Sequence, residues 1–204
     1  MLHHLNREAT VLVVPENDAE AVMIIDLAKA LQIELIISGQ PHGARLEHED
    51  NLEERLRATL KSDVVVVEMP GPDEEARLRK VGFNLMVIDH HRYDEVDRMT
   101  DVETGEALPS SLEQFLAAFD VTDEEIQTAG FDPRIVRGIG SMDRGFIWAL
   151  KRDGYTETEI KEISHVVRDL SRRARGDEKT TLNEQTAAEA WEHRRQVGEY
   201  LVVT

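Results

Sequence analysis

Asp89, His90 and His91 stand side by side, directly after the apolar run Leu85-Met86-Val87-Ile88. The apolar run predicts a strand that is buried on both faces. In an open α/β sheet, ligand sites collect just past the carboxyl ends of such strands. Carboxylate and imidazole groups together suit divalent metals such as manganese, zinc or iron. The three residues are therefore a candidate metal site, although two adjacent histidines on their own more often form ordinary polar surface.

Other acidic residues follow other predicted strands. Asp18 and Glu20 come after a strand predicted at 9–14, and Glu68 ends a strand predicted at 63–68. Simpler interpretations exist, because Asp18 also suits a helix N-cap and Glu68 also suits a turn. Asp143 lies between two predicted helices, where a helix cap and a metal ligand are equally good interpretations. Acids at three strand ends, one of them with histidines, favour a shared site over three unrelated turns.

The elements that would position these residues alternate between strand and helix in the first half of the chain. Strands are predicted at 9–14, 33–38, 63–68 and 84–89, and helices at 18–31, 51–60 and 74–81. This alternation predicts an α/β fold, with a parallel sheet covered by helices on both faces.

The second half is predicted to be mostly helical. Helices are expected at 109–119, 123–128, 133–141, 144–152, 156–175 and 183–197, with a hinge at 176–181 and a terminal strand at 199–204. We therefore divide the chain into an α/β half with the metal site, 1–108, and a mostly helical half of the same domain, 109–204.

Composition excludes several classes of function. The 204 residues are 41% hydrophobic, which is enough for one good core. The chain has no cysteine, so disulfides, thiolate zinc sites and cysteine nucleophiles are excluded. No apolar stretch approaches the ~20 residues of a membrane helix, and the first residues lack the features of a signal peptide. A cytoplasmic protein without membrane contact is the expectation.

The charge balance limits the partners. Net charge is −17, from 24 Lys and Arg against 41 Asp and Glu. Because affinity for nucleic acid depends on neutralising phosphates, most of this surface would repel a long duplex. Arg168 and Arg172 share one face of the helix predicted at 156–175, and Arg144 follows Asp143 directly. Arginine suits phosphate well, so these three are candidate substrate-binding residues, although pairing with nearby acids is the simpler interpretation.

The residues also resemble a known family. Val87-Ile88-Asp89-His90-His91 is similar to the name-giving motif of the DHH phosphoesterases, which include RecJ-type exonucleases, oligoribonucleases, family II inorganic pyrophosphatases and cyclic-dinucleotide phosphodiesterases. The other acids follow in the family's order: Glu16-x-Asp18-x-Glu20 at the first motif, Glu68 at the second and Asp143 at the fourth. Pro109-Ser110-Ser111 resembles the segment after the third motif, and the likeness spans roughly 9–150.

The resemblance implies a metal-dependent phosphodiesterase or nuclease that hydrolyses short oligonucleotides or dinucleotides. It implies catalysis by Asp89, His90 and His91, with His91 also contacting substrate beside Arg144, Arg168 and Arg172. Two divalent cations are expected, Mn²⁺ in preference to Mg²⁺. Their implied ligands are Asp18, Glu20, Glu68, Asp89, His90 and Asp143.

Three departures from the family pattern leave an alternative open. Glu20 and Glu68 stand where the family has aspartates, and Val14 stands near the place of a histidine that many members carry. The second domain of many members is missing or reduced, with residues 198–203 as its start, so the sequence would be a shortened one. The alternative is a catalytically impaired member that binds a protein partner in a nucleic-acid-processing complex. A pyrophosphatase is disfavoured, because no basic C-terminal domain is seen.

Overall fold

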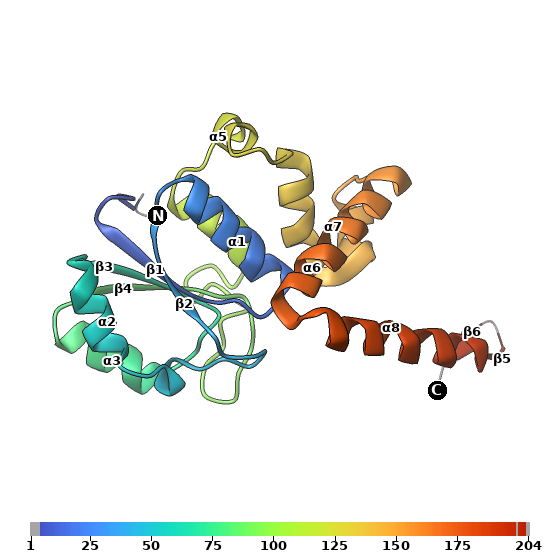
Figure 1. Ribbon diagram of the computed structural model, residues 1–204, viewed down its shortest axis with the longest axis horizontal. Helices are drawn as coiled ribbons and strands as arrows, with labels where there is room; N and C mark the ends of the chain where they lie inside the picture. Colours follow the sequence, from blue (N-terminus) through green and yellow to red (C-terminus); the bar gives the residue numbers. More distant parts are fainter. Residues whose placement is uncertain (1–4, 199, 203–204) are drawn as a thin grey trace.

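The computed structural model describes residues 5–198 and 200–202, and a four-stranded parallel sheet lies at its centre (Figure 1). Its strands are β1 (Thr10–Pro15), β2 (Glu34–Ser38), β3 (Asp63–Val67) and β4 (Asn84–Ile88), in the spatial order β2-β1-β3-β4. In the register of β1, Val13 lies beside Ile36 on one side and Val66 on the other. The predicted α/β class is confirmed. The strand order reverses at β1 and β3, which is where α/β sheets bind ligands.

Two helices cover one face of the sheet. They are α2 (Leu52–Thr59), which follows the short 3₁₀ helix η1 (Leu46–His48), and α3 (Pro72–Lys80). Alternate strand residues such as Val11 and Val13 point into this layer, because successive side chains of a strand face opposite ways.

The opposite face carries α1 (Ala19–Ala30), α4 (Ser111–Ala118) and α5 (Asp123–Thr128). Leu12 and Val14, the intervening residues of β1, belong to this second core. Figure 1 shows α1 on the side of the sheet away from α2 and α3. The prediction of helices on both faces is therefore confirmed.

Two longer helices extend the second core. α6 (Pro133–Arg152) contributes Val136 and Ile139, and α7 (Glu157–Arg175) contributes Leu170. The helical half thus shares its hydrophobic core with the sheet. Among the described residues, no helix combines the length and the apolar character needed to cross a membrane.

The last part of the chain differs from its prediction. α8 (Asp177–Glu192) starts directly after Gly176, so the expected hinge shrinks to one glycine with φ of 82°. Residues 177–181 are all charged or polar and have no apolar residues at helical spacing, so the sequence pattern did not predict that they are helical. Residues 195–197, expected to be helical, form strand β5 (Arg195–Val197), paired antiparallel with β6 (Tyr200–Val202).

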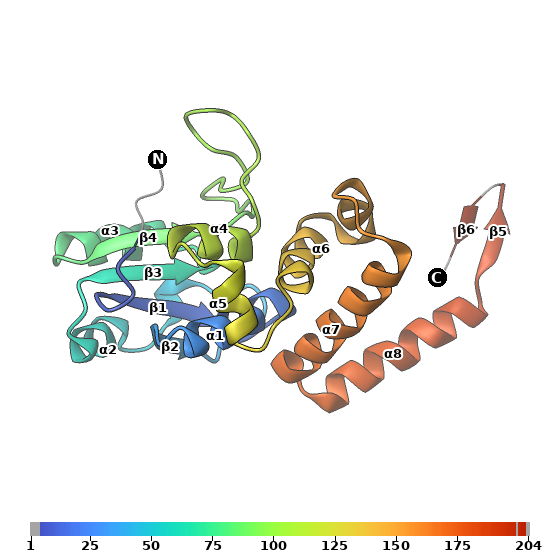
Figure 2. The same cartoon turned by 90° about the horizontal axis from the view of Figure 1, so that it is seen from above.

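β5 and β6 form a hairpin at the end of α8, and together they project from the body of the molecule (Figure 2). Positions 199, 203 and 204 of the predicted strand 199–204 lie outside the described residues.

Two further predictions need correction. β4 is the last strand of the sheet, so Leu85, Met86 and Val87 are only half-buried, and Ile88 alone of the run is fully covered. Asp143 lies within α6 and not in a loop, because the two predicted helices join directly at a kink. The kink falls at Gly145 and Phe146, whose backbone dihedrals are not helical.

Candidate metal centre

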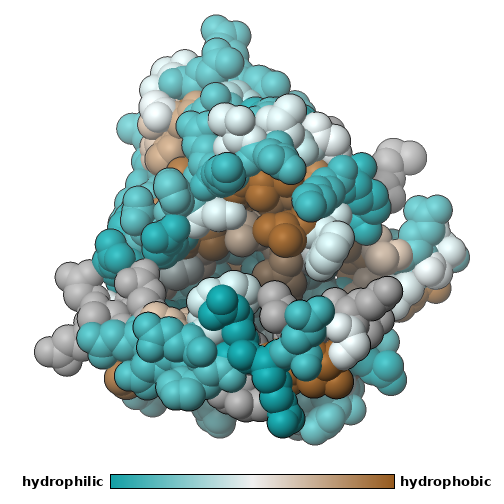
Figure 3. Space-filling model, turned by 90° about the vertical axis from the view of Figure 1, so that its right-hand side faces the viewer, coloured by the Kyte–Doolittle hydropathy of each residue, from teal (hydrophilic) through white to brown (hydrophobic). Residues whose placement is uncertain are grey.

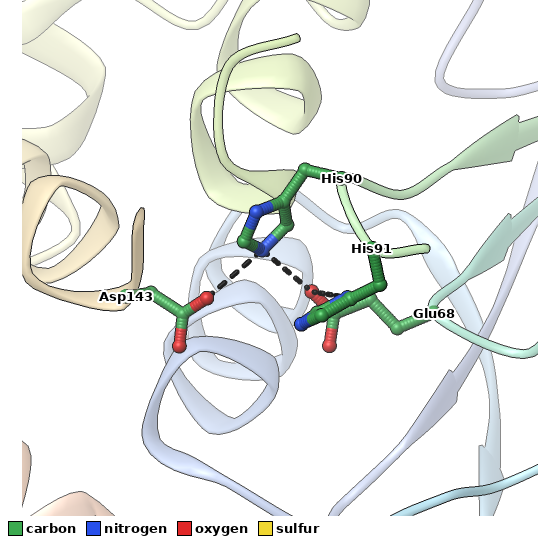
Figure 4. Close-up of side chains that lie close together, drawn as sticks. All are labelled: Glu68, His90, His91 and Asp143. Carbon is green, nitrogen blue, oxygen red and sulfur yellow. Dashed lines mark ion pairs between the residues drawn. The ribbon is translucent and has the colours of Figure 1, made fainter. Parts of the chain in front are cut away.

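The centre of the candidate site is the imidazole of His90. Its Nε2 atom lies 2.9 Å from Asp143 Oδ2, 3.4 Å from Glu68 Oε1 and 3.6 Å from Glu20 Oε2. Figure 4 shows His90 pointing between Glu68 and Asp143, with the ring of His91 beside Glu68. The four carboxylate and imidazole groups come from α1, the end of β3, the end of β4 and α6. The structure therefore joins residues that are up to 123 positions apart in the sequence, from Glu20 to Asp143.

Glu68 reaches this cluster through an unusual backbone conformation. Its φ of 50° lies in the left-handed region, which residues other than glycine, asparagine and aspartate seldom adopt. Such conformations cost ~1–3 kcal/mol and gather at functional sites. The turn directly after β3 is thus held in a strained form that brings a carboxylate to the sheet edge.

Several buried polar atoms of the cluster make no hydrogen bond within the described residues. They are Glu20 Oε2, Glu68 Oε1 and His90 Nε2, the last of which forms an ion pair with Asp143 without a hydrogen bond. Buried charged groups are normally paired or bound to a metal. Unpartnered oxygen and nitrogen atoms that converge on one point are what a divalent cation requires.

The dimensions of the cluster also suit a cation. Potential ligand atoms of Glu68, His90, His91 and Asp143 all lie within 4.8 Å of one another. Ligands placed ~2.1 Å from one ion are at most about 4.2 Å apart, so a contraction of a fraction of an ångström would close this shell. The residues fit a metal with mixed oxygen and nitrogen ligands, such as Mn²⁺ or Zn²⁺.

Burial and mutual repulsion shift the pKa values here. Burial, followed by the charge of Glu68, raises the pKa of Asp18 to about 6. Burial raises the pKa of Glu20 to about 8. Burial alone would lower the pKa of His90, but Asp143, Glu20 and Glu68 outweigh it and raise that pKa to about 12. The site holds an excess of negative charge that a proton or a cation neutralises.

Asp18 and Glu20 each have a structural role as well. Asp18 is the N-cap of α1, and its Oδ1 accepts a hydrogen bond from the Ala21 amide at 2.8 Å. Glu20 uses Oε1 to accept the Leu112 amide of α4 at 3.0 Å, which leaves Oε2 in the cluster. Capping and site formation are therefore combined in these residues. Glu16, the third acid of this segment, is exposed.

Asp89 lies beside the cluster and orients His91. Its Oδ1 accepts the His91 amide at 3.0 Å and the Tyr93 hydroxyl at 3.3 Å, and it lies 3.1 Å from His91 Nδ1. Hydrogen bonding to Asp89 raises the pKa of His91. Asp89 Oδ2 is buried without a partner in the described structure, so a role as metal ligand stays a prediction.

The predicted substrate arginines contact acidic residues or face the solvent. Arg144 lies 2.9 Å from Glu113 and 3.2 Å from Asp153. It therefore pairs with nearby acids, as the simpler interpretation of its sequence position predicts. Arg172 lies 3.9 Å from Asp169, and Arg168 is exposed on α7. Their contact with substrate stays a prediction.

Two cavities of about 230 Å³ each border the cluster on different sides. The polar one is lined by His42, His91, Arg92 and Tyr93, and the other by Asp143, Phe146 and Arg175. Asp18 lines both. Sequence patterns missed His42 and Phe146, because only the packing of η1 and α6 brings them to this edge.

No protein-family model matches this chain, and no curated protein matches it.

Proposed function

We propose that this protein is a metal-dependent phosphodiesterase of the DHH type, which hydrolyses dinucleotides or short single-stranded oligonucleotides. The observation that carries the proposal is the convergence of His90 Nε2 with carboxylates from three other elements at the carboxyl edge of the sheet. The order of Asp18, Glu68, Asp89-His90-His91 and Asp143 along the chain supports the same family.

Glu68, His90, His91 and Asp143 are the residues that would hold the first divalent ion, for which we propose Mn²⁺. Glu20 Oε2, Asp18 and Asp89 Oδ2 stand next to them and are the proposed donors for a second. Bound divalent ions would supply an activated water and offset the charge of the phosphate. Imidazole among carboxylates favours Mn²⁺ over Mg²⁺.

The chain's own contribution is to orient the reacting groups. Asp89 and Tyr93 fix the ring of His91 through one carboxylate oxygen. With Nδ1 facing Asp89, the second ring nitrogen keeps the lone pair that would bind the first ion. Glu20 accepts a hydrogen bond from the Leu112 amide at the start of α4, and this bond holds its carboxylate in place within the cluster.

A cavity on each of two sides of the cluster supports a diester over a monoester substrate. A phosphodiester carries a substituent on both sides of the reacting phosphorus, and two spaces of about 230 Å³ can receive them. We assign the activity to the cytoplasm, where short nucleotide products arise and where a chain without cysteine loses no stabilising disulfide.

The decisive experiment combines thermal unfolding with hydrolysis. Mn²⁺ added to metal-free protein at about 100 times its Kd should stabilise the fold by about 2.7 kcal/mol, which raises Tm by roughly 5–10 °C. His90→Gln and Asp143→Asn should lose most of this rise. His165→Gln, on the exposed surface of α7, is the matched control and should keep it.

The same preparations test catalysis. Wild type should hydrolyse a dinucleotide only with a divalent ion, and Asp89→Ala and His90→Ala should each lower the rate more than about tenfold. If Mn²⁺ neither raises Tm nor supports hydrolysis, the phosphodiesterase proposal is wrong. The alternative of a binding subunit in a nucleic-acid-processing complex would then be favoured.

A further inference from the structure

The cavity between α1, α6 and α7 has a lining of two kinds. Asp18, Glu20 and Asp143 of the metal centre form one part of its lining. Apolar side chains, including Met142, Phe146 and Val167, form another part. The space of about 230 Å³ therefore runs from the metal centre to an apolar wall.

Phe146 is the unusual member of this wall. Its backbone has φ of 53° and ψ of −151°, a combination that is nearly restricted to glycine. Its side chain gains little in return from burial, because the residue is 71% exposed. A strained backbone that presents an exposed aromatic ring beside a catalytic cluster is the pattern of a ligand contact.

The surroundings of Phe146 specify the kind of ligand. Arg175, at the end of α7, lines the same cavity as Asp18. Figure 3 shows hydrophobic side chains gathered around a hollow on the side that carries α6, α7 and α8, with hydrophilic groups at its border. An aromatic face with apolar neighbours and a nearby guanidinium is how proteins stack a single unpaired base.

We propose that this cavity binds the nucleobase next to the scissile phosphate, with Phe146 as the stacking surface. The inference rests on the proposed function and adds the substrate feature that the site recognises. The polar cavity with His42, His91 and Arg92 then receives the sugar–phosphate side of the substrate. Base identity is not specified by this contact, because every base has an aromatic face.

The test compares AMP with ribose 5-phosphate, which lacks the base, by calorimetry in the presence of Mn²⁺. Stacking one base on an aromatic side chain changes affinity by roughly 5- to 150-fold. Wild type should bind AMP at least about tenfold more tightly than ribose 5-phosphate. Phe146→Gly should remove most of this preference, and because glycine adopts the same backbone without strain, the kink in α6 is kept.

Two variants control for changes in α6 itself. Phe146→Tyr keeps an aromatic ring and should keep the preference for AMP. Trp148→Ala removes a side chain that is 72% exposed on the same helix but does not line the cavity, and it should also keep the preference. Equal affinity of wild type for the two ligands would overturn the inference, as would an undiminished preference in Phe146→Gly.

A base-free diester separates this inference from the proposed function. Methyl p-nitrophenyl phosphate carries no nucleobase, so wild type should hydrolyse it with Mn²⁺ if the phosphodiesterase proposal is right. Hydrolysis of this compound without any preference for AMP would refute the base site alone. Preference for AMP without metal-dependent hydrolysis would refute the phosphodiesterase and leave the base site standing.

Discussion

At the scale of single residues, the conformation of Glu68 sets function against stability. Its φ of 50° is strained for a glutamate, and its carboxylate lies among other acids. Glu68→Asn should relieve the backbone, since asparagine tolerates this region, and should raise the free energy of unfolding of the metal-free protein by about 1 kcal/mol. The same change should abolish the rise in Tm with Mn²⁺. Urea unfolding and thermal shifts measure the two effects.

Asp120→Asn is the matched control for that substitution. Asp120 has φ of 49° and is exposed after α4, outside the metal cluster. Its replacement should leave the Mn²⁺ response intact. Unchanged Mn²⁺ stabilisation in Glu68→Asn would show that Glu68 is not a metal ligand.

The residue types of the site were predictable from sequence, but its geometry was not. Asp18, Glu68 and Asp89 follow parallel strands, whose carboxyl ends meet at one sheet edge, so their proximity follows from the strand pattern. The position of Asp143 depends on how α6 packs. The position of Phe146 depends on a kink in α6 that no local sequence motif predicts. The left-handed backbone of Glu68 likewise has no glycine or asparagine to mark it.

At the scale of elements, the start of α4 joins the site to α6. Ser110 caps α4 by accepting the Glu113 amide, and Glu20 accepts the Leu112 amide. A Cβ atom on Gly140 of α6 would lie 2.4 Å from the Ser110 hydroxyl oxygen. Helix packing here therefore requires a glycine, although glycine weakens a helix interior.

Gly140→Ala tests that contact. Helix propensity alone predicts that this substitution raises the free energy of unfolding by about 1 kcal/mol. The clash with Ser110 and the loss of its N-cap should instead lower the free energy of unfolding by about 1 kcal/mol or more. Urea unfolding followed by circular dichroism measures the sign. Ser110→Ala should cost less in the Gly140→Ala background than in wild type, because the cap is already displaced. A net increase in stability for Gly140→Ala would contradict the packing argument.

The N-terminal segment is attached to α5 through an ion pair that depends on pH. Arg7, followed by the Thr122 amide, lowers the pKa of Glu125 from 4.5 to about 2. Since the folded value lies below the unfolded one, this carboxylate stabilises the fold above about pH 4.5 and loses its effect as pH falls toward 2. Arg7→Met should therefore cost more stability at about pH 6 than at about pH 3. In a Glu125→Gln background, the cost of Arg7→Met should be independent of pH.

At the scale of the whole molecule, the net charge of −17 decides which nucleic acids can approach. A long duplex brings many phosphates, and 41 Asp and Glu residues outnumber the 24 Lys and Arg residues that could neutralise them. Dinucleotides and short single strands should be cleaved and duplex DNA left intact. The slope of log affinity against log salt should be smaller in magnitude than about 3, as few phosphates are engaged. Processive degradation of long strands at physiological salt would contradict this prediction.

The two hydrophobic layers of the sheet also imply an order of events during synthesis. The layer beneath α2 and α3 is built entirely from residues between Val11 and Val87, a contiguous stretch. The opposite layer draws on residues from Leu12 to Leu170. Because a chain leaves the ribosome N-terminus first, the first layer can close while α6 is still unmade. Asp143 arrives later, so the nascent protein passes through a stage in which the sheet is covered on one side and the metal centre lacks its last carboxylate.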